Sequence, residues 1–111
     1  MTEKFNWFAA RLLFESRIDD SILPLFEERV VLIKSDLGKE DAEKKARKLG
    51  QASDLEYQNA EHEVVAWRFK EILDIVQLNE TRIGEGSEVY HHYLKADEVE
   101  QVRESLKPGS L

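Results

Sequence analysis

The chain has 111 residues and a formal net charge of −7, with 16 basic and 23 acidic side chains. Hydrophobic residues make up 41% of the sequence and charged residues 35%, which is too apolar for a disordered chain and predicts one folded domain over residues 1–111, with its core at about 5–106. Cysteine is absent, which excludes disulfides, thiolate nucleophiles and cysteine-bound metals.

The excess of acidic residues is the reverse of what nucleic-acid-binding proteins usually show, because binding to phosphates favours Lys and Arg. We therefore expect no nucleic-acid partner, and the negative charge favours a basic protein partner. No apolar stretch approaches the roughly 20 residues that span a bilayer, and residues 1–7 lack the apolar run of a signal peptide. We expect a cytoplasmic protein that does not associate with membranes.

The first part of the chain predicts two strands. Residues 7–15 alternate, so that Phe8, Ala10, Leu12 and Phe14 share one face. A loop over residues 16–24 carries Asp19-Asp20-Ser21 and closes at Pro24, and a second strand runs from about 25 to 34. Residues 30–33 are apolar on both faces, which predicts at least partial cover on the second side of the sheet.

The segment after the second strand predicts a helix. Ala42, Ala46 and Leu49 follow the i, i+4, i+7 spacing of a single helix face. Acidic residues near the start and the basic run over residues 44–48 near the end complement the helix dipole and form i,i+4 pairs. We expect Gly50 just past the C-cap. Because the apolar stripe is mostly alanine, the helix should lie close to a sheet.

Three further strands are expected, at residues 55–59, 63–78 and 88–94, with a turn at 60–62 and a loop at 79–87. The alternation of the long strand breaks at Lys70-Glu71, where a β-bulge would restore the facing of the later residues. A change from strand to short helix is the alternative, because periodicity does not distinguish the two.

The C-terminal part predicts a short helix. Asp97 with Glu100 fits an acidic capping box, and an apolar stripe precedes the stop at Pro108-Gly109. The stripe consists of Val99, Val102 and Leu106. The element order is therefore β-β-α-β-β-β-α, which predicts an α+β fold: an antiparallel sheet of about five strands with the helices packed on one face.

The sequence offers no recognisable catalytic or metal site. His91 and His92 are adjacent on a predicted strand and should point to opposite faces, while His62 lies in a predicted turn, so we expect no metal and no cofactor. Strand-borne glutamates could pair with arginines, which is usually structural cross-strand pairing, and we assign no catalytic residue. These are Glu15, Glu27 and Glu28, with Arg11, Arg29 and Arg68 as partners.

Two tryptophans suggest a binding surface. If Trp7 and Trp67 lie on the sheet face away from the helices, they form an aromatic surface flanked by Arg11 and Arg68, which is typical of protein interfaces. The alternative is that they pack the second side of the sheet. The binding hypothesis comprises Trp7, Arg11, Glu28, Trp67 and Arg68.

Several strand segments resemble the bacterial domain-of-unknown-function family numbered 4288, over about Phe5 to Leu94. The resemblance is carried by Trp7-Phe8-Ala9-Ala10-Arg11-Leu12-Leu13-Phe14-Glu15, Phe26-Glu27-Glu28-Arg29-Val30-Val31-Leu32, Glu56-Tyr57-Gln58-Asn59-Ala60, Trp67-Arg68-Phe69, Glu71-Ile72-Leu73-Asp74 and Glu88-Val89-Tyr90. It implies a small bacterial cytoplasmic domain, and it implies no activity, cofactor or catalytic residue.

We therefore expect a non-enzymatic protein-interaction domain, one version of which is an immunity-type or antitoxin-like protein that masks a basic partner. The alternative is a small hydrolytic or ligand-binding domain with a pocket formed by charged strand residues. That pocket would bring together Arg11, Glu15, Glu28, Arg68 and His91. A third alternative is a homodimer that forms through the exposed edge of the last strand.

Overall fold

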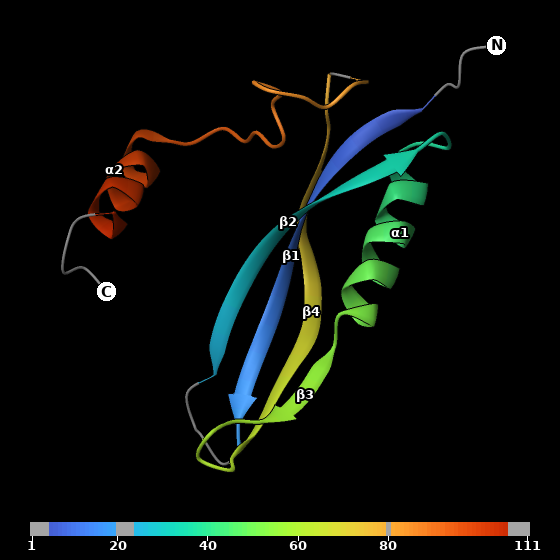
Figure 1. Cartoon of the computed structure of the whole chain (residues 1–111). Coiled ribbons are helices and arrows are strands. Elements are labelled where there is room, and N and C mark those ends of the chain that lie inside the picture. Colours follow the sequence, from blue (N-terminus) through green and yellow to red (C-terminus); the bar gives the residue numbers. More distant parts are fainter. Residues whose placement is uncertain (1–4, 20–23, 80, 107–111) are drawn as a thin grey trace.

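The computed structural model describes residues 5–19, 24–79 and 81–106 (Figure 1). Within these residues four strands form one antiparallel sheet in the order β2-β1-β4-β3. The strands are β1 (Asn6–Ile18), β2 (Leu25–Ser35), β3 (Leu55–Gln58) and β4 (Val64–Gln77). Helix α1 (Lys39–Ala52) links β2 to β3, and helix α2 (Ala96–Ser105) follows β4 after an irregular segment. The predicted α+β class and antiparallel sheet are confirmed.

The predicted fifth strand is wrong. Residues 88–94 are irregular, so the described elements run β-β-α-β-β-α. The segment instead bonds to the sheet through the side chain of Tyr90. Of the two described helices, α1 packs on the sheet and α2 does not, so the expectation that both helices do so is also wrong. The predicted loop residues Asp20 and Ser21 and the predicted stop at Pro108-Gly109 lie outside the described residues.

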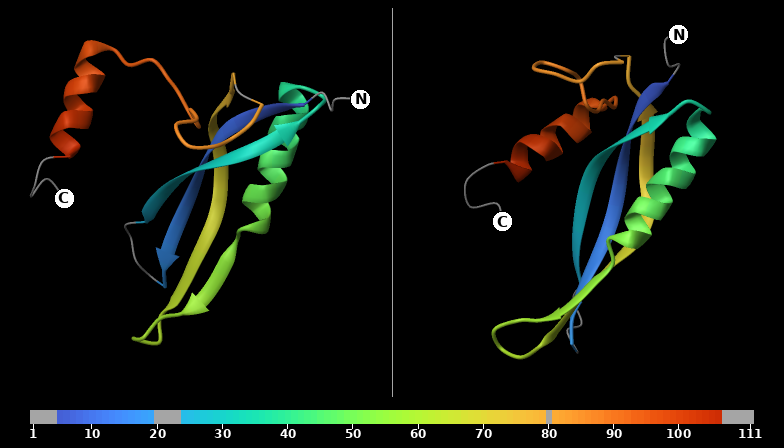
Figure 2. Two further views of the ribbon diagram at one scale, coloured as in Figure 1. Left: turned by 45° about the horizontal axis from the view of Figure 1, so that its top comes forward. Right: turned by 45° about the vertical axis from the view of Figure 1, so that its right-hand side comes forward.

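The core forms between the sheet and α1. Phe8, Ala10, Leu12 and Phe14 point from β1 to the same side, and each is at most 2% exposed. On α1, Ala42 and Ala46 are completely buried against them, as the sequence predicts. Alanine has no side chain beyond Cβ, so the helix axis lies close to the strands. Figure 2 shows α1 running along one face of the sheet.

Two β-bulges keep the long strand β4 in phase with this core. The pairing with β1 shifts once at Lys70 and again at Leu73, so each position adds one residue to β4. As a result Phe69, Ile72 and Ile75 all face α1 despite their irregular spacing. The predicted bulge at Lys70-Glu71 is confirmed, and the second bulge was not predicted.

Gly50 lies inside α1 and does not follow its C-cap, which corrects the predicted helix end. It is buried, and the ring of Phe69 lies directly against its Cα. That ring also makes an edge contact with Phe14 at 5.8 Å between centroids. Glycine is therefore required by the close approach of the helix to β4 and not by a left-handed backbone.

We predict that Gly50→Ala destabilises the fold. Alanine in a helix interior ordinarily stabilises by about 1 kcal/mol relative to glycine. Here the added Cβ would lie 2.5 Å from a ring carbon of Phe69, and overpacking of this kind costs roughly 1–3 kcal/mol. The free energy of unfolding, measured by urea denaturation, should therefore fall.

Gly84→Ala is the matched control, because nothing lies within 4 Å of its added Cβ. Its free energy of unfolding should stay within about 0.5 kcal/mol of the wild-type value. A Gly50→Ala variant more stable than wild type would contradict the described packing of Phe69.

Candidate functional site

The face of the sheet opposite α1 carries no helix packed upon it in the described structure, and we call it the open face. The strand register assigns side chains to it from three strands. They are Trp7, Ala9, Arg11, Leu13 and Glu15 of β1, Phe26, Glu28, Val30, Leu32 and Lys34 of β2, and Arg68, Glu71, Asp74 and Val76 of β4. The bulge residue Lys70 also belongs to this face, because its Nζ lies 4.0 Å from Oε2 of Glu15.

Arg11 is the centre of a polar network on the open face. It lies on the middle strand β1 and reaches diagonally to Glu28 of β2, because Glu28 pairs with Leu13 in the register. The guanidinium donates to both carboxylate oxygens, with Nε–Oε1 at 2.6 Å and Nη2–Oε2 at 2.8 Å. A bidentate pair fixes the plane of the guanidinium as well as its position.

Tyr90 joins this network from the irregular segment after β4. Its hydroxyl donates to Oδ2 of Asp74 at 2.9 Å and lies 3.4 Å from Nη1 of Arg11, which donates to it. Nδ1 of His92 lies 3.0 Å from the same oxygen. Because the hydroxyl proton of Tyr90 is directed to Asp74, the hydroxyl oxygen can accept a hydrogen bond from His92 when Nδ1 carries the ring proton. The network therefore attaches residues 90–92 to two strands of the sheet.

The network changes the proton affinity of its members. Hydrogen bonding to Arg11 lowers the pKa of Glu28 below its usual range, and Glu28 in turn raises the pKa of Arg11. Partial desolvation, followed by the hydrogen bond to Asp74, raises the pKa of Tyr90. All three directions favour the same state: an ion pair beside a neutral phenol.

The polar groups of the network satisfy one another. No buried side-chain nitrogen or oxygen among residues 5–19, 24–79 and 81–106 lacks a hydrogen-bond partner. Chemically, the arrangement holds Arg11 and the irregular residues 88–94, which we call the C-terminal arm, in place. It presents no vacant buried donor or acceptor among the described residues. Sequence reasoning identified Arg11 and Glu28 but missed Asp74, Tyr90 and His92. No spacing rule could have found them, because an irregular segment brings Tyr90 back to β4.

The predicted aromatic surface is divided between the two faces of the sheet. Trp7 lies on the open face, and its Nε1 donates to the carbonyl of Thr81 at 3.0 Å. Trp67 pairs with the buried Ser16 and packs against the core on the α1 side. The two tryptophans therefore do not form one surface. Arg68 is on the open face but bonds to Glu56 of β3 at 2.9 Å, away from Arg11.

The residues of the predicted ligand pocket do not converge. Arg68 and Glu28 are separated by the whole width of β1 and bond to different partners. Glu15 pairs with Arg17 at 2.6 Å, and His91 lies 2.5 Å from Glu88. The remaining predicted carboxylate, Glu27, pairs with Arg29 on the α1 side of β2. Most of these contacts are local ion pairs.

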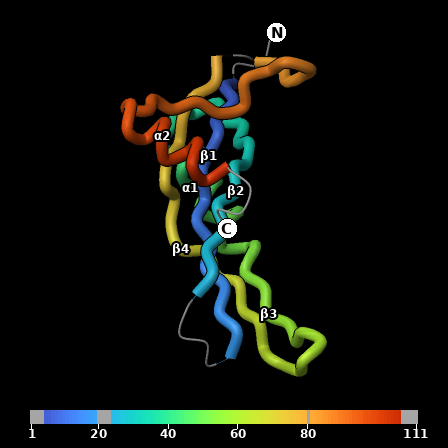
Figure 3. Tube along the Cα trace, turned by 90° about the vertical axis from the view of Figure 1, so that its left-hand side faces the viewer, coloured from blue at the N-terminus to red at the C-terminus, as the bar shows by residue number. Residues whose placement is uncertain are grey.

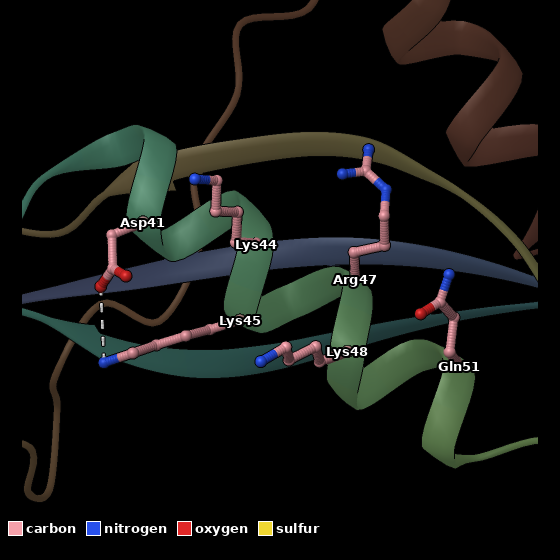
Figure 4. Close-up of a pocket in the computed structure, with 6 residues that line it drawn as sticks. All are labelled: Asp41, Lys44, Lys45, Arg47, Lys48 and Gln51. Atoms are coloured by element: carbon pink, nitrogen blue, oxygen red, sulfur yellow. Dashed lines mark ion pairs between the residues drawn. The ribbon is translucent and has the colours of Figure 1, made fainter.

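The described residues also form shallow pockets, one of which shares His92 with the network. One, of about 250 Å³, is lined by Asn79, Glu88, His91, His92 and Tyr93. No group of three His, Cys, Asp or Glu residues that could hold a metal ion occurs in the part of the chain that the structure describes. The second, of about 410 Å³, lies along the outer side of α1 (Figure 4).

The pocket on α1 is lined by the side chains of one helix. They are Asp41, Lys44, Lys45, Arg47, Lys48 and Gln51, and they spread over its outer surface (Figure 4). Lys45 is engaged with Asp41 at 3.5 Å and donates to the carbonyl of Lys34 at 2.8 Å. The basic residues lie in the middle of α1, because the helix continues to Ala52. They do not occupy its last turn as the sequence suggested.

Apolar side chains on the open face are left in solvent beside the polar network. Phe26 is 52% exposed and Val30 is 44% exposed. Both lie on the edge strand β2. In a domain of this size, such a group of exposed residues beside a fixed arginine has the composition of a protein interface.

The sequence model of the family described as Domain of unknown function (DUF4288) matches residues 7–91. The match spans most of the chain, so the chain belongs to this family, which confirms the resemblance. No curated protein and no solved structure matches the chain. In the described residues, no helix is long and apolar enough to cross a membrane.

We predict that the Arg11–Glu28 pair makes stability depend on acidic pH. The pKa of Glu28 is lower in the folded state than the ordinary glutamate value of about 4.3, so the unfolded chain takes up the proton first as the pH falls. The pair therefore stabilises the fold above that value and loses this effect as the pH falls through the lower pKa of the folded state.

Urea denaturation at pH values from neutral down to about 3 should show a shallower loss of stability in Glu28→Gln than in wild type. At neutral pH the variant should be about 0.2–1 kcal/mol less stable, because the pair is partly exposed. Arg11→Met should flatten the profile equally, since either substitution breaks the pair. Parallel pH profiles for the three proteins would contradict the assignment.

Proposed function

We propose that this member of the DUF4288 family is a non-enzymatic protein-interaction domain that binds its partner through the open face. The observation that carries the proposal is the sheet face without a packed helix, on which Phe26 and Val30 remain exposed. Burying such apolar area provides the main favourable term in protein association. Arg11, held in a fixed orientation by Glu28, supplies a polar anchor beside it.

The charge of the chain favours a basic partner. A net charge of −7 over 111 residues attracts positively charged proteins at long range and accelerates their encounter. An immunity-type or antitoxin-like role, in which the domain masks a basic surface, is the version of the proposal that uses this charge. A cytoplasmic location in a bacterium fits the same role.

A ligand-binding or hydrolytic role is the less favoured alternative. It requires Arg11, Glu28 and Arg68 to act on one ligand, whereas Arg11 and Glu28 bond to each other and Arg68 bonds to Glu56. No buried side-chain donor or acceptor of the described residues is left without a partner. The apolar patch beside the network lies on the surface of the edge strand β2, which suits a protein better than a small polar substrate.

A substitution on the open face should abolish partner binding. Tagged wild-type chain is used to capture proteins from the source cell at low and moderate salt, alongside Val30→Lys. We expect wild type to retain one protein in stoichiometric amount. A second, untagged copy of the chain would count as such a protein. Val30→Lys should lose it, because the lysine ammonium would have to be desolvated at the interface.

Leu49→Lys is the matched control, since Leu49 is 43% exposed on α1 and Val30 is 44% exposed on the open face. The control variant should keep the captured protein. The proposal fails when wild type retains no stoichiometric protein at either salt concentration, or when both variants bind as wild type does.

A further inference from the structure

Helix α2 stands apart from the rest of the molecule. It makes no contact with α1 or with any strand in the described structure, and none of its residues is buried. Figure 1 shows it set off to one side, and Figure 3 shows it in front of the sheet on the side opposite α1. It therefore lies over the open face without touching it.

An isolated helix of this length is not stable by itself. Helix α2 has 10 residues, and helices shorter than about 12–15 residues are marginal in water. Val99, Val102 and Leu106 form an apolar stripe along it, and Val102 and Leu106 are 46% and 78% exposed. The stripe requires a surface to pack against.

The overall dimensions show the same incomplete packing. The Cα radius of gyration is 17.4 Å, whereas a compact domain of 111 residues has a value of about 13 Å. A chain of this size that buried α2 against its sheet would be smaller. The open face and α2 thus both expose apolar side chains, and neither packs against another described helix or strand of the same chain.

The charges of the open face are balanced. It carries as many basic as acidic side chains among the residues named here, although the chain as a whole is strongly acidic. Its charged residues include Arg11, Lys34, Arg68 and Lys70, against Glu15, Glu28, Glu71 and Asp74. Helix α2 is acidic: it carries Asp97, Glu98, Glu100 and Glu104 against Arg103. On the open face an acidic helix therefore meets no net negative charge, although the chain as a whole is acidic.

The connection to α2 directs it outward. Tyr90 and His92 are held on the open face by the polar network, and three residues then separate His92 from the start of α2 at Ala96. The first of them, Tyr93, is 97% exposed, so the chain turns into solvent immediately after its attachment. Short connections that hold an element away from its own domain favour its exchange between two copies.

We propose that the chain forms a twofold dimer in which α2 of each copy packs, through Val99, Val102 and Leu106, on the open face of the other copy. The proposal rests on the proposed function, because it keeps the open face as the binding surface and identifies its partner as a second copy in place of a basic protein. The exchange covers both exposed surfaces of both chains with one symmetric, closed contact. This arrangement replaces the hypothesis of a dimer that forms through the edge of the last strand, because residues 88–94 form no strand.

Cysteine crosslinking tests the exchange, because the native chain contains no cysteine. Val30→Cys protein is mixed with Val102→Cys protein, and a short bismaleimide is added. We expect a crosslinked species of twice the 12.9 kDa chain mass from this mixture. Val102→Cys mixed with Lys44→Cys, on the outer side of α1, is the matched control and should give none.

Light scattering on the uncrosslinked wild-type protein should give a mass near twice 12.9 kDa. Val102→Asp should raise the dissociation constant of the dimer at least about tenfold. Both cysteine sites are exposed, so the crosslinking variants should fold as wild type does.

Three outcomes would overturn the exchange. The first is a monomeric mass with no crosslink between chains. The second is a crosslink formed only within a Val30→Cys, Val102→Cys double variant that stays monomeric, which would place α2 on its own sheet. The third is a crosslink in the Lys44→Cys control of equal yield. A monomer that retains a different protein through Val30 would refute the dimer but leave the proposed function standing.

Discussion

The close packing of α1 on the sheet is the contact on which the rest of the structure depends. Ala42, Ala46 and Gly50 have little or no side chain, so the helix approaches β1 and β4 closely enough for the Phe69 ring to lie against Gly50. Two bulges in β4 keep its large side chains on this face. Because most of the apolar residues of β1 and β4 are committed to one side, the other side is left with a mixture of charges and a small apolar patch.

Hydrogen bonds hold the side chains of the open face in place, whereas apolar packing holds those on the α1 side. The Arg11–Glu28 pair joins β1 to β2, and Tyr90 joins the C-terminal arm to both Arg11 and Asp74. These bonds position the arm without covering Phe26 or Val30. The result is a domain with a helix in solvent beside a sheet face that no described helix covers, an arrangement suited to association between chains.

Elements with strong local periodicity were predictable from the sequence. The alternation in β1, the alanine stripe of α1 and the phase break at Lys70 can each be read from the residues of a single element. The C-terminal arm was not predictable in this way. Residues 88–94 are rich in Tyr and His, which favours a strand, but the segment is attached through the side chain of Tyr90, whose partners Arg11 and Asp74 lie far away in the sequence. The sequence alone does not place Gly50 correctly, because glycine is common after helices and equally suited to a close contact.

The residues of the candidate site were also predictable only where they lie on strands with a clear alternation. Arg11 and Glu28 lie on such strands. The separation of Trp7 from Trp67 depends on the strand register, which composition does not reveal. The central claim is that α2 is covered by a second copy of the chain. Amide hydrogen exchange in α2, measured over a range of protein concentrations, tests it most directly. We expect protection at high concentration that disappears on dilution, and protection that is absent or independent of concentration would contradict the claim.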